Sequence, residues 1–157
     1  MKDSSKNPYY ALELLSREYD IKYNKKDLEK TNCLYLLEQM NGRGKKNDWY
    51  GGKSKNSAMC RLYSHLHDKK DSVRQNMELN NTKRIRLHIV DYNIAPNELA
   101  QKEYQLIDKM FVEDRKRTIN RDFRHCLKSL ENLKKQGFTK ATHDKRIGIV
   151  QYKEMAS

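Results

Sequence analysis

Disulfide-forming and zinc-binding cysteine patterns are missing from this sequence. Its 157 residues include three cysteines, Cys33, Cys60 and Cys126, and no two of them form a C-x-x-C pair. This spacing argues against a disulfide framework and against a zinc module. We therefore expect the three thiols to be reduced and buried in a cytoplasmic protein.

Long apolar runs are missing as well. No segment approaches the ~20 apolar residues that a membrane-spanning helix needs, and the polar residues 1–8 are not followed by the apolar stretch of a signal peptide. We expect no membrane partner. Hydrophobic residues make up 36% of the chain and charged residues 34%, so the core must be modest and shared among amphipathic elements.

Positive charge is what the chain has in excess. Lys and Arg together number 33 against 21 Asp and Glu, which gives a formal net charge of +12. A positive field of this size favours a polyanion, and nucleic acid is the leading candidate. Charge alone does not separate DNA from RNA, or an enzyme from a binding protein.

Hydrophobic periodicity predicts an α+β fold, with a small antiparallel three-stranded sheet flanked by helices and with helical extensions at both ends. The polar stretch 68–83 is expected to be an exposed loop that contains no more than one helical turn. The predicted elements are strands over 33–40, 48–53 and 84–92, helices over 9–21, 57–68, 96–112 and 122–136, and an extended piece at 147–152.

Three parts follow from this order: an N-terminal helical extension (1–31), a core (32–112) and a basic C-terminal helical extension (113–157). The first two strands of the core are predicted to form a hairpin, because the segment between them, NGRGKKN, has two glycines and three cations.

The 96–112 helix carries a carboxylate on its apolar side. Leu99, Leu106, Ile107 and Met110 define the apolar stripe, and Glu103 falls at its centre. A buried carboxylate needs a cation, a metal or several hydrogen-bond donors. Glu103 is therefore either half of a structural ion pair or a catalytic, metal-binding acid.

The 57–68 helix carries two functional candidates on one face. Arg61 and His65 are four residues apart, so they lie together beside the apolar stripe of this helix. Taken singly, each is more often a surface or half-buried residue than a catalytic one. Together they could line the rim of the surface on which the helix packs.

The order of these residues resembles that of the GIY-YIG nuclease family. The segment CLYLL stands where that family has Gly-Ile-Tyr, YGG stands for Tyr-Ile-Gly, RLYSH supplies an Arg and a His, and EYQLID resembles the segment around the family's Glu. The resemblance covers roughly residues 32–111. The matching positions are Tyr35, Tyr50, Gly52, Arg61, His65 and Glu103.

This resemblance implies phosphodiester hydrolysis with one divalent metal. Glu103 would hold Mg²⁺, or Mn²⁺, together with waters, and Arg61 would brace the scissile phosphate. Either Tyr35 or Tyr50 would take the proton of the attacking water, with His65 orienting or deprotonating that tyrosine. A cation nearby would have to favour the phenolate.

The resemblance also implies a DNA substrate, most simply double-stranded, and a compact restriction-type or phage-type enzyme. A homodimer would be needed to cut both strands. The rival hypothesis is a catalytically inactive basic protein that binds DNA or RNA. The expected contacts to phosphates and DNA are Gly52, Lys53, Arg84, Arg86 and Asn120, with His88 and the loop cations Arg43, Lys45 and Lys46 as further candidates.

Overall fold

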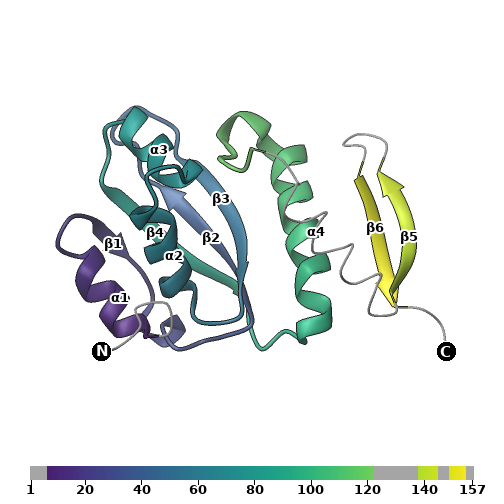
Figure 1. Ribbon diagram of the computed structural model, residues 1–157. Coiled ribbons are helices and arrows are strands. Elements are labelled where there is room, and N and C mark those ends of the chain that lie inside the picture. The colour runs from purple at the N-terminus through teal and green to yellow at the C-terminus, as the bar shows by residue number, and fades with distance from the viewer. Residues whose placement is uncertain (1–6, 122–137, 145–148, 155–157) are drawn as a thin grey trace.

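The computed structural model describes residues 7–121, 138–144 and 149–154 of the chain (Figure 1). Its elements follow in this order: α1 (Pro8–Leu15), β1 (Asp20–Lys22), the 3-10 turn η1 (Lys25–Asp27), β2 (Cys33–Gln39), β3 (Asp48–Ser54), α2 (Ala58–His67), α3 (Ser72–Leu79), β4 (Arg84–Asp91), α4 (Pro96–Asp114), η2 (Arg115–Arg117), β5 (Phe138–Asp144) and β6 (Ile149–Glu154). The α+β class is as predicted.

The main sheet has four strands in the order β1-β4-β2-β3, and it is mixed rather than antiparallel. The prediction of three antiparallel strands was therefore wrong by one strand. Strands β2, β3 and β4 pair antiparallel as expected, whereas β1 pairs with β4 in parallel. The sequence placed residues 20 and 21 at the end of a helix and Lys22 in the following connector. That helix stops at Leu15, and residues 20–22 pair with β4 instead.

Helix α3 is a second correction, because the stretch 68–83 was expected to be a loop. The side chain of Asp71 accepts a hydrogen bond from Val73 N and so caps the first turn. Val73 and Met77, four residues apart, are both buried. Two apolar residues are too few for a clear helical period in the sequence.

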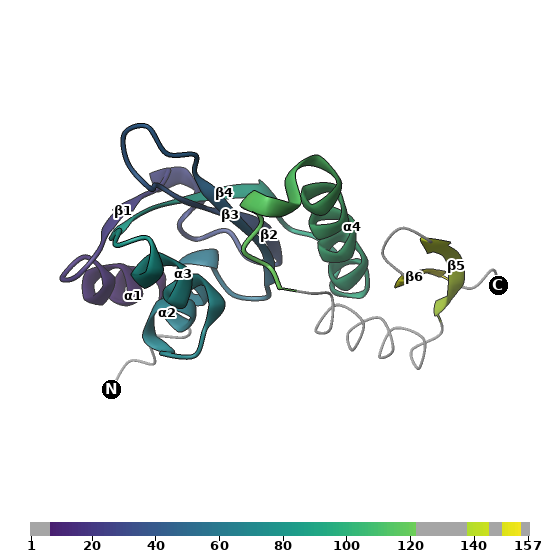
Figure 2. The same cartoon turned by 90° about the horizontal axis from the view of Figure 1, so that it is seen from above.

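Helices α1, α2 and α3 cover one face of the sheet (Figures 1 and 2). Alternate residues of β2, among them Tyr35 and Leu37, point into the core on this side. On the other face Leu34 packs against Ile94 and Leu99 near the start of α4. Helix α4 lies along β3, so much of this second face, towards β4 and β1, is not covered by it (Figure 2).

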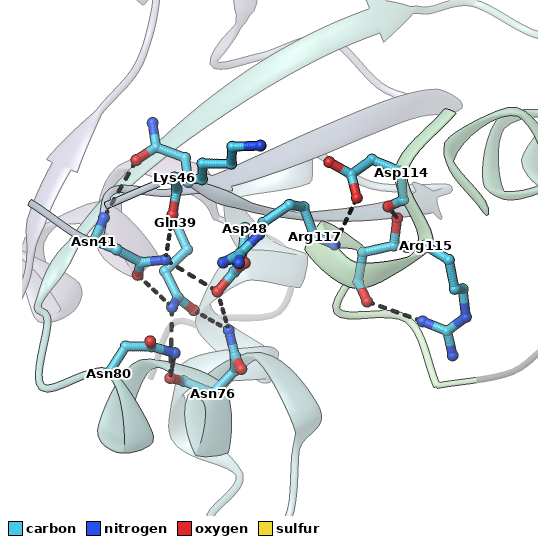
Figure 3. Close-up of polar contacts among 11 residues, drawn as sticks. Gln39, Asn41, Lys46, Asp48, Asn76, Asn80, Asp114, Arg115 and Arg117 are labelled. Atoms are coloured by element: carbon cyan, nitrogen blue, oxygen red, sulfur yellow. Dashed lines mark hydrogen bonds and ion pairs between the residues drawn. The ribbon is translucent and has the colours of Figure 1, made fainter. Parts of the chain in front are cut away.

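A buried polar network lies at the end of the sheet where β2 finishes and β3 begins (Figure 3). Gln39, Asn41 and Asp48 are each less than a tenth exposed. Asp48 Oδ2 accepts hydrogen bonds from Asn41 Nδ2 and Asn76 Nδ2, each at 3.0 Å, and Oδ1 accepts one from Arg117 Nη1 at 3.3 Å. The network joins the β2–β3 loop, α3 and η2.

The C-terminal part contains an antiparallel hairpin of β5 and β6. Strand β6 confirms the extended piece expected at 147–152, whereas β5 was not predicted, so the extension is not helical throughout. The helix expected over 122–136 lies outside the described residues, as does Cys126. Within the ranges that the structure describes, no helix has the length and apolar character needed to cross a membrane.

Candidate active site

A chain of three polar side chains links strand β2 to helices α2 and α3. The Tyr35 hydroxyl lies 2.8 Å from His65 Nε2, and His65 Nδ1 lies 2.8 Å from Asp71 Oδ2. A carboxylate only accepts hydrogen bonds, so Asp71 keeps the proton of a neutral imidazole on Nδ1. Nε2 is then the acceptor, and the phenol of Tyr35 donates to it.

Two glycines of β3 make room for this arrangement. A Cβ atom on Gly52 would lie 2.5 Å from the Tyr35 hydroxyl oxygen, so only glycine lets the phenol lie across β3. A Cβ atom on Gly51 would lie 2.7 Å from Met110 Sδ, so this residue admits α4 on the opposite face. The two glycines of the YGG segment therefore serve the two faces of one strand.

Tyr50 and Arg61 complete the cluster around His65. The Tyr50 ring packs edge-on against the imidazole, with 4.7 Å between ring centroids. Arg61 hydrogen-bonds to Tyr35 and is exposed, Tyr50 is half-buried, and Tyr35 is fully buried. The structure thus brings together four of the residues that the sequence singled out, and Tyr50 is the more accessible of the two phenols.

The electrostatics of Tyr35 differ from the expectation that a cation would favour its phenolate. Burial raises the pKa of Tyr35 well above its usual value, and the charges of Tyr50 and Glu103 raise it further, whereas Arg61 opposes the shift only in part. Tyr35 is therefore a neutral hydrogen-bond donor at ordinary pH, which leaves Tyr50 as the better candidate for a base.

Glu103 faces inward as predicted, with only 3% of its side chain exposed. Its Oε1 atom lies 3.1 Å from Lys53 Nζ, so the structural ion pair considered in the sequence is present. Lys53 and Gly51 share the face of β3 that packs on α4, whereas Tyr50 and Gly52 point to the other face. Because Glu103 contributes to the pKa of Tyr35, the two clusters are within electrostatic range across the strand.

Strand β3 lies at the edge of the sheet, and its edge is held by a segment from beyond α4. Asn120 is 2% exposed, and its side chain accepts a hydrogen bond from Gly51 N and donates one to Gly51 O, each at 2.9 Å. Ile119 N donates to Trp49 O at 2.7 Å. Asn120 was expected to contact DNA, but its amide is engaged on the β3 backbone, so it positions the site.

The remaining basic candidates lie away from this cluster. Arg84 and Arg86 are on β4, which β2 separates from β3, and they pair with Asp20 and Glu38. The three loop cations, Arg43, Lys45 and Lys46, are exposed in the β2–β3 hairpin.

Asp71 is the residue of the site that sequence reasoning missed. The signal available was its position before Ser72 and Val73, which suits a helix cap. Helix α3 was not predicted because the surrounding stretch is polar. The contact of Asp71 with His65 depends on the packing of α2 against α3.

The chemistry of the site suits a lightly coordinated divalent cation. In the part of the chain that the structure describes, no three His, Cys, Asp or Glu side chains are grouped to hold a metal. Mg²⁺ usually keeps several waters and binds through one or two carboxylates together with substrate phosphates. Glu103 supplies one such carboxylate, which Lys53 would continue to contact.

Comparison with protein-family models, curated proteins and solved structures finds no match for this chain.

Proposed function

We propose that the chain is a metal-dependent DNA endonuclease of the GIY-YIG type. The observation that carries this proposal is the convergence of Tyr50, Arg61 and His65 beside one face of β3, with Glu103 buried against the other face. These groups come from three separate elements, β3, α2 and α4, which the fold brings together.

The exposed members of the cluster would act on the substrate directly. Arg61 binds the scissile phosphate with its planar guanidinium and stabilises the charge that develops there. Tyr50, as a phenolate stabilised by the neighbouring charge of Arg61, would accept the proton of the attacking water. The imidazole of His65 packs beside the Tyr50 ring. The buried Tyr35 does not reach the substrate; it fixes the positions of His65 and Arg61 through its hydroxyl.

Glu103 would hold Mg²⁺ or Mn²⁺ with water and phosphate oxygens as the other ligands. When bound, the metal supplies charge stabilisation on the phosphoryl oxygens. Lys53 places a second positive charge beside Glu103, where it helps to attract the phosphate. The substrate is double-stranded DNA, and a homodimer would allow both strands to be cut by a compact restriction-type or phage-type enzyme.

The second candidate is an inactive protein that binds DNA or RNA through its charge. The observation in its favour is the ion pair of Lys53 with Glu103, because the carboxylate is compensated without a metal.

Cleavage of supercoiled plasmid in Mg²⁺ or Mn²⁺ tests the proposal. We expect nicked or linear products that disappear in EDTA and with Glu103→Gln. Arg61→Ala should lower the cleavage rate by about 10²–10³-fold, as for removal of one transition-state donor. Arg17→Ala, an exposed cation in the turn after α1, is the matched control and should keep its activity. Binding of plasmid without cleavage by the folded wild-type protein, in either metal, would favour the second candidate.

A further inference from the structure

Among the described residues, α4 leaves part of the second face of the main sheet open, and this open face carries a row of side chains across all four strands. Lys22 of β1 pairs in register with Arg86 of β4, Arg86 with Glu38 of β2, and Glu38 with Trp49 of β3. Neighbouring strands are ~4.8 Å apart, so the row spans roughly 14 Å. The row ends on an aromatic ring at one edge and on a cation at the other.

Trp49 is stacked rather than packed into the core. Its indole lies against the imidazole of His88, with ring centroids 5.6 Å apart and planes inclined by 27°. Trp49 also lines a cleft of about 550 Å³ between the sheet and the end of α4, together with Lys46, Asn47 and Arg117. One side of the indole therefore has an aromatic partner while the residue remains accessible from the cleft.

Cations dominate the opposite end of the row. A second hollow, of about 760 Å³, lies between β4 and the segment after β1, where Tyr23 is its aromatic member. The cations that line it are Lys22, Lys25, Lys26 and Arg86, with His88 shared between this hollow and the stack.

The carboxylates nearby offset only part of this positive charge. Burial alone would raise the pKa of Glu38, but hydrogen bonds from His88 and Asn47 and the charge of Arg86 outweigh it and lower the pKa. Glu38 is thus ionised, and its side chain is 13% exposed. Its carboxylate already accepts hydrogen bonds from His88 and Asn47 and pairs with Arg86. In the second hollow Asp27 pairs with Lys30 at 2.6 Å. Glu113 and Asp114 do line the first cleft, beside Trp49.

We propose that this open face binds an unpaired strand of nucleic acid, with one base stacked on Trp49 and the backbone directed over Arg86 and Lys22. A groove of cations combined with an accessible aromatic ring is the arrangement that binds single strands, because every base presents a face for stacking and every nucleotide a phosphate. A paired base inside a duplex cannot reach the indole without leaving its stack. The acidic rim formed by Glu113 and Asp114 offers acceptors to the amino groups of a base rather than to a phosphate.

The chain contains one tryptophan, so its fluorescence reports on this surface directly. We expect a short thymine oligonucleotide, titrated in EDTA, to quench the emission of Trp49 in the wild-type protein. An abasic strand of the same length should bind at least several-fold more weakly with little quenching. Quenching that is equal for the abasic strand or for polyglutamate, or the absence of quenching at saturation, would overturn the proposal.

Variants separate stacking from charge. Trp49→Ala should weaken binding of a labelled oligonucleotide roughly 10- to 100-fold, the range for loss of one stacked base, and Trp49→Phe should retain most of the affinity. Lys22→Ala and Arg86→Ala should each reduce the slope of log affinity against log salt by about 0.7. Arg17→Ala, an exposed cation in the turn after α1, is the control and should change neither quantity. Circular dichroism checks that each variant is folded.

Two further measurements distinguish this proposal from the nuclease proposal. Glu103→Gln should abolish cleavage, whereas quenching of Trp49 by the oligonucleotide should persist, because Glu103 lines neither hollow. Tighter binding of duplex than of the unpaired strand, with the same quenching, would refute a site for unpaired bases even if the protein cuts plasmid. Quenching without any cleavage would refute only the nuclease.

Discussion

Two clusters of polar side chains are attached to opposite ends of strand β2, and they are built from different chemical groups. The cluster at Tyr35 contains a phenol, an imidazole and a carboxylate, and it borders on the exposed Arg61. The cluster at Gln39 consists of amides around the carboxylate of Asp48 (Figure 3). Groups that change protonation near an accessible rim can perform chemistry, whereas satisfied amides fix geometry.

The largest effect should come from the amide cluster. Asp48→Ala leaves the hydrogen-bonding groups of Asn41, Asn76 and Arg117 without their acceptor, so we expect the free energy of unfolding to fall by about 3–5 kcal/mol. Urea denaturation measures this change. Asp48→Asn keeps the shape and should cost less. A loss below 1 kcal/mol for the alanine variant would mean that the cluster is not a structural centre.

The tyrosine cluster should respond in rate rather than in stability. Asp71→Asn preserves a residue that caps helices well, but it removes the charge that fixes the tautomer of His65. We expect kcat for plasmid cleavage to fall by on the order of 10- to 100-fold, as for partners that orient a functional side chain, with little change in KM and a shifted pH profile.

Asp71→Ala and Asp68→Asn are the comparisons for that variant. The alanine change should add a loss of ~1 kcal/mol in stability because the cap is removed as well. Asp68 is three residues earlier and does not contact His65, so its variant should cut normally. An Asp71→Asn enzyme with wild-type kcat and pH profile would show that Asp71 only caps α3.

The smallest effect concerns Cys33, two residues before Tyr35 on β2. Burial raises the pKa of this thiol to about 11, so the folded protein holds its proton where the unfolded chain would release it. Stability should therefore be unaffected below the ordinary thiol pKa and decline as the pH rises from there towards 11. Cys33→Ala should weaken this decline in urea titrations at successive pH values; an unchanged slope would contradict it.

Much of the fold could be predicted from local patterns. An apolar run and the glycine-containing segment after it located the β2–β3 hairpin, and helical spacing showed that Glu103 faces inward. Strand β1 was not predicted, because three residues are too few to show a hydrophobic period and the strand depends on pairing with β4, which is distant in the sequence. The amide network was not predicted either. Gln39 and Asn76 are 37 residues apart, and nothing in the sequence around them indicates that they are buried.

The candidate site was predictable to a different extent. The order of the motif residues anticipated that Tyr35, Tyr50, Arg61 and His65 would meet. It could not show that Tyr35 is sealed from solvent, because burial depends on the helices that pack over β2. The division of the site between two faces of β3 was equally hidden, since it requires the register of the strand against both α2 and α4.

The segment that follows η2 has a consequence for assembly. Main-chain groups of Trp49 and Gly51 on the outer side of β3 are already occupied by Ile119 and Asn120. An edge strand with free main-chain groups invites pairing with another molecule, and here that route is blocked over these residues. If two copies cut opposite DNA strands as proposed, they would have to join at this edge through side-chain surfaces instead of a continuous intermolecular sheet.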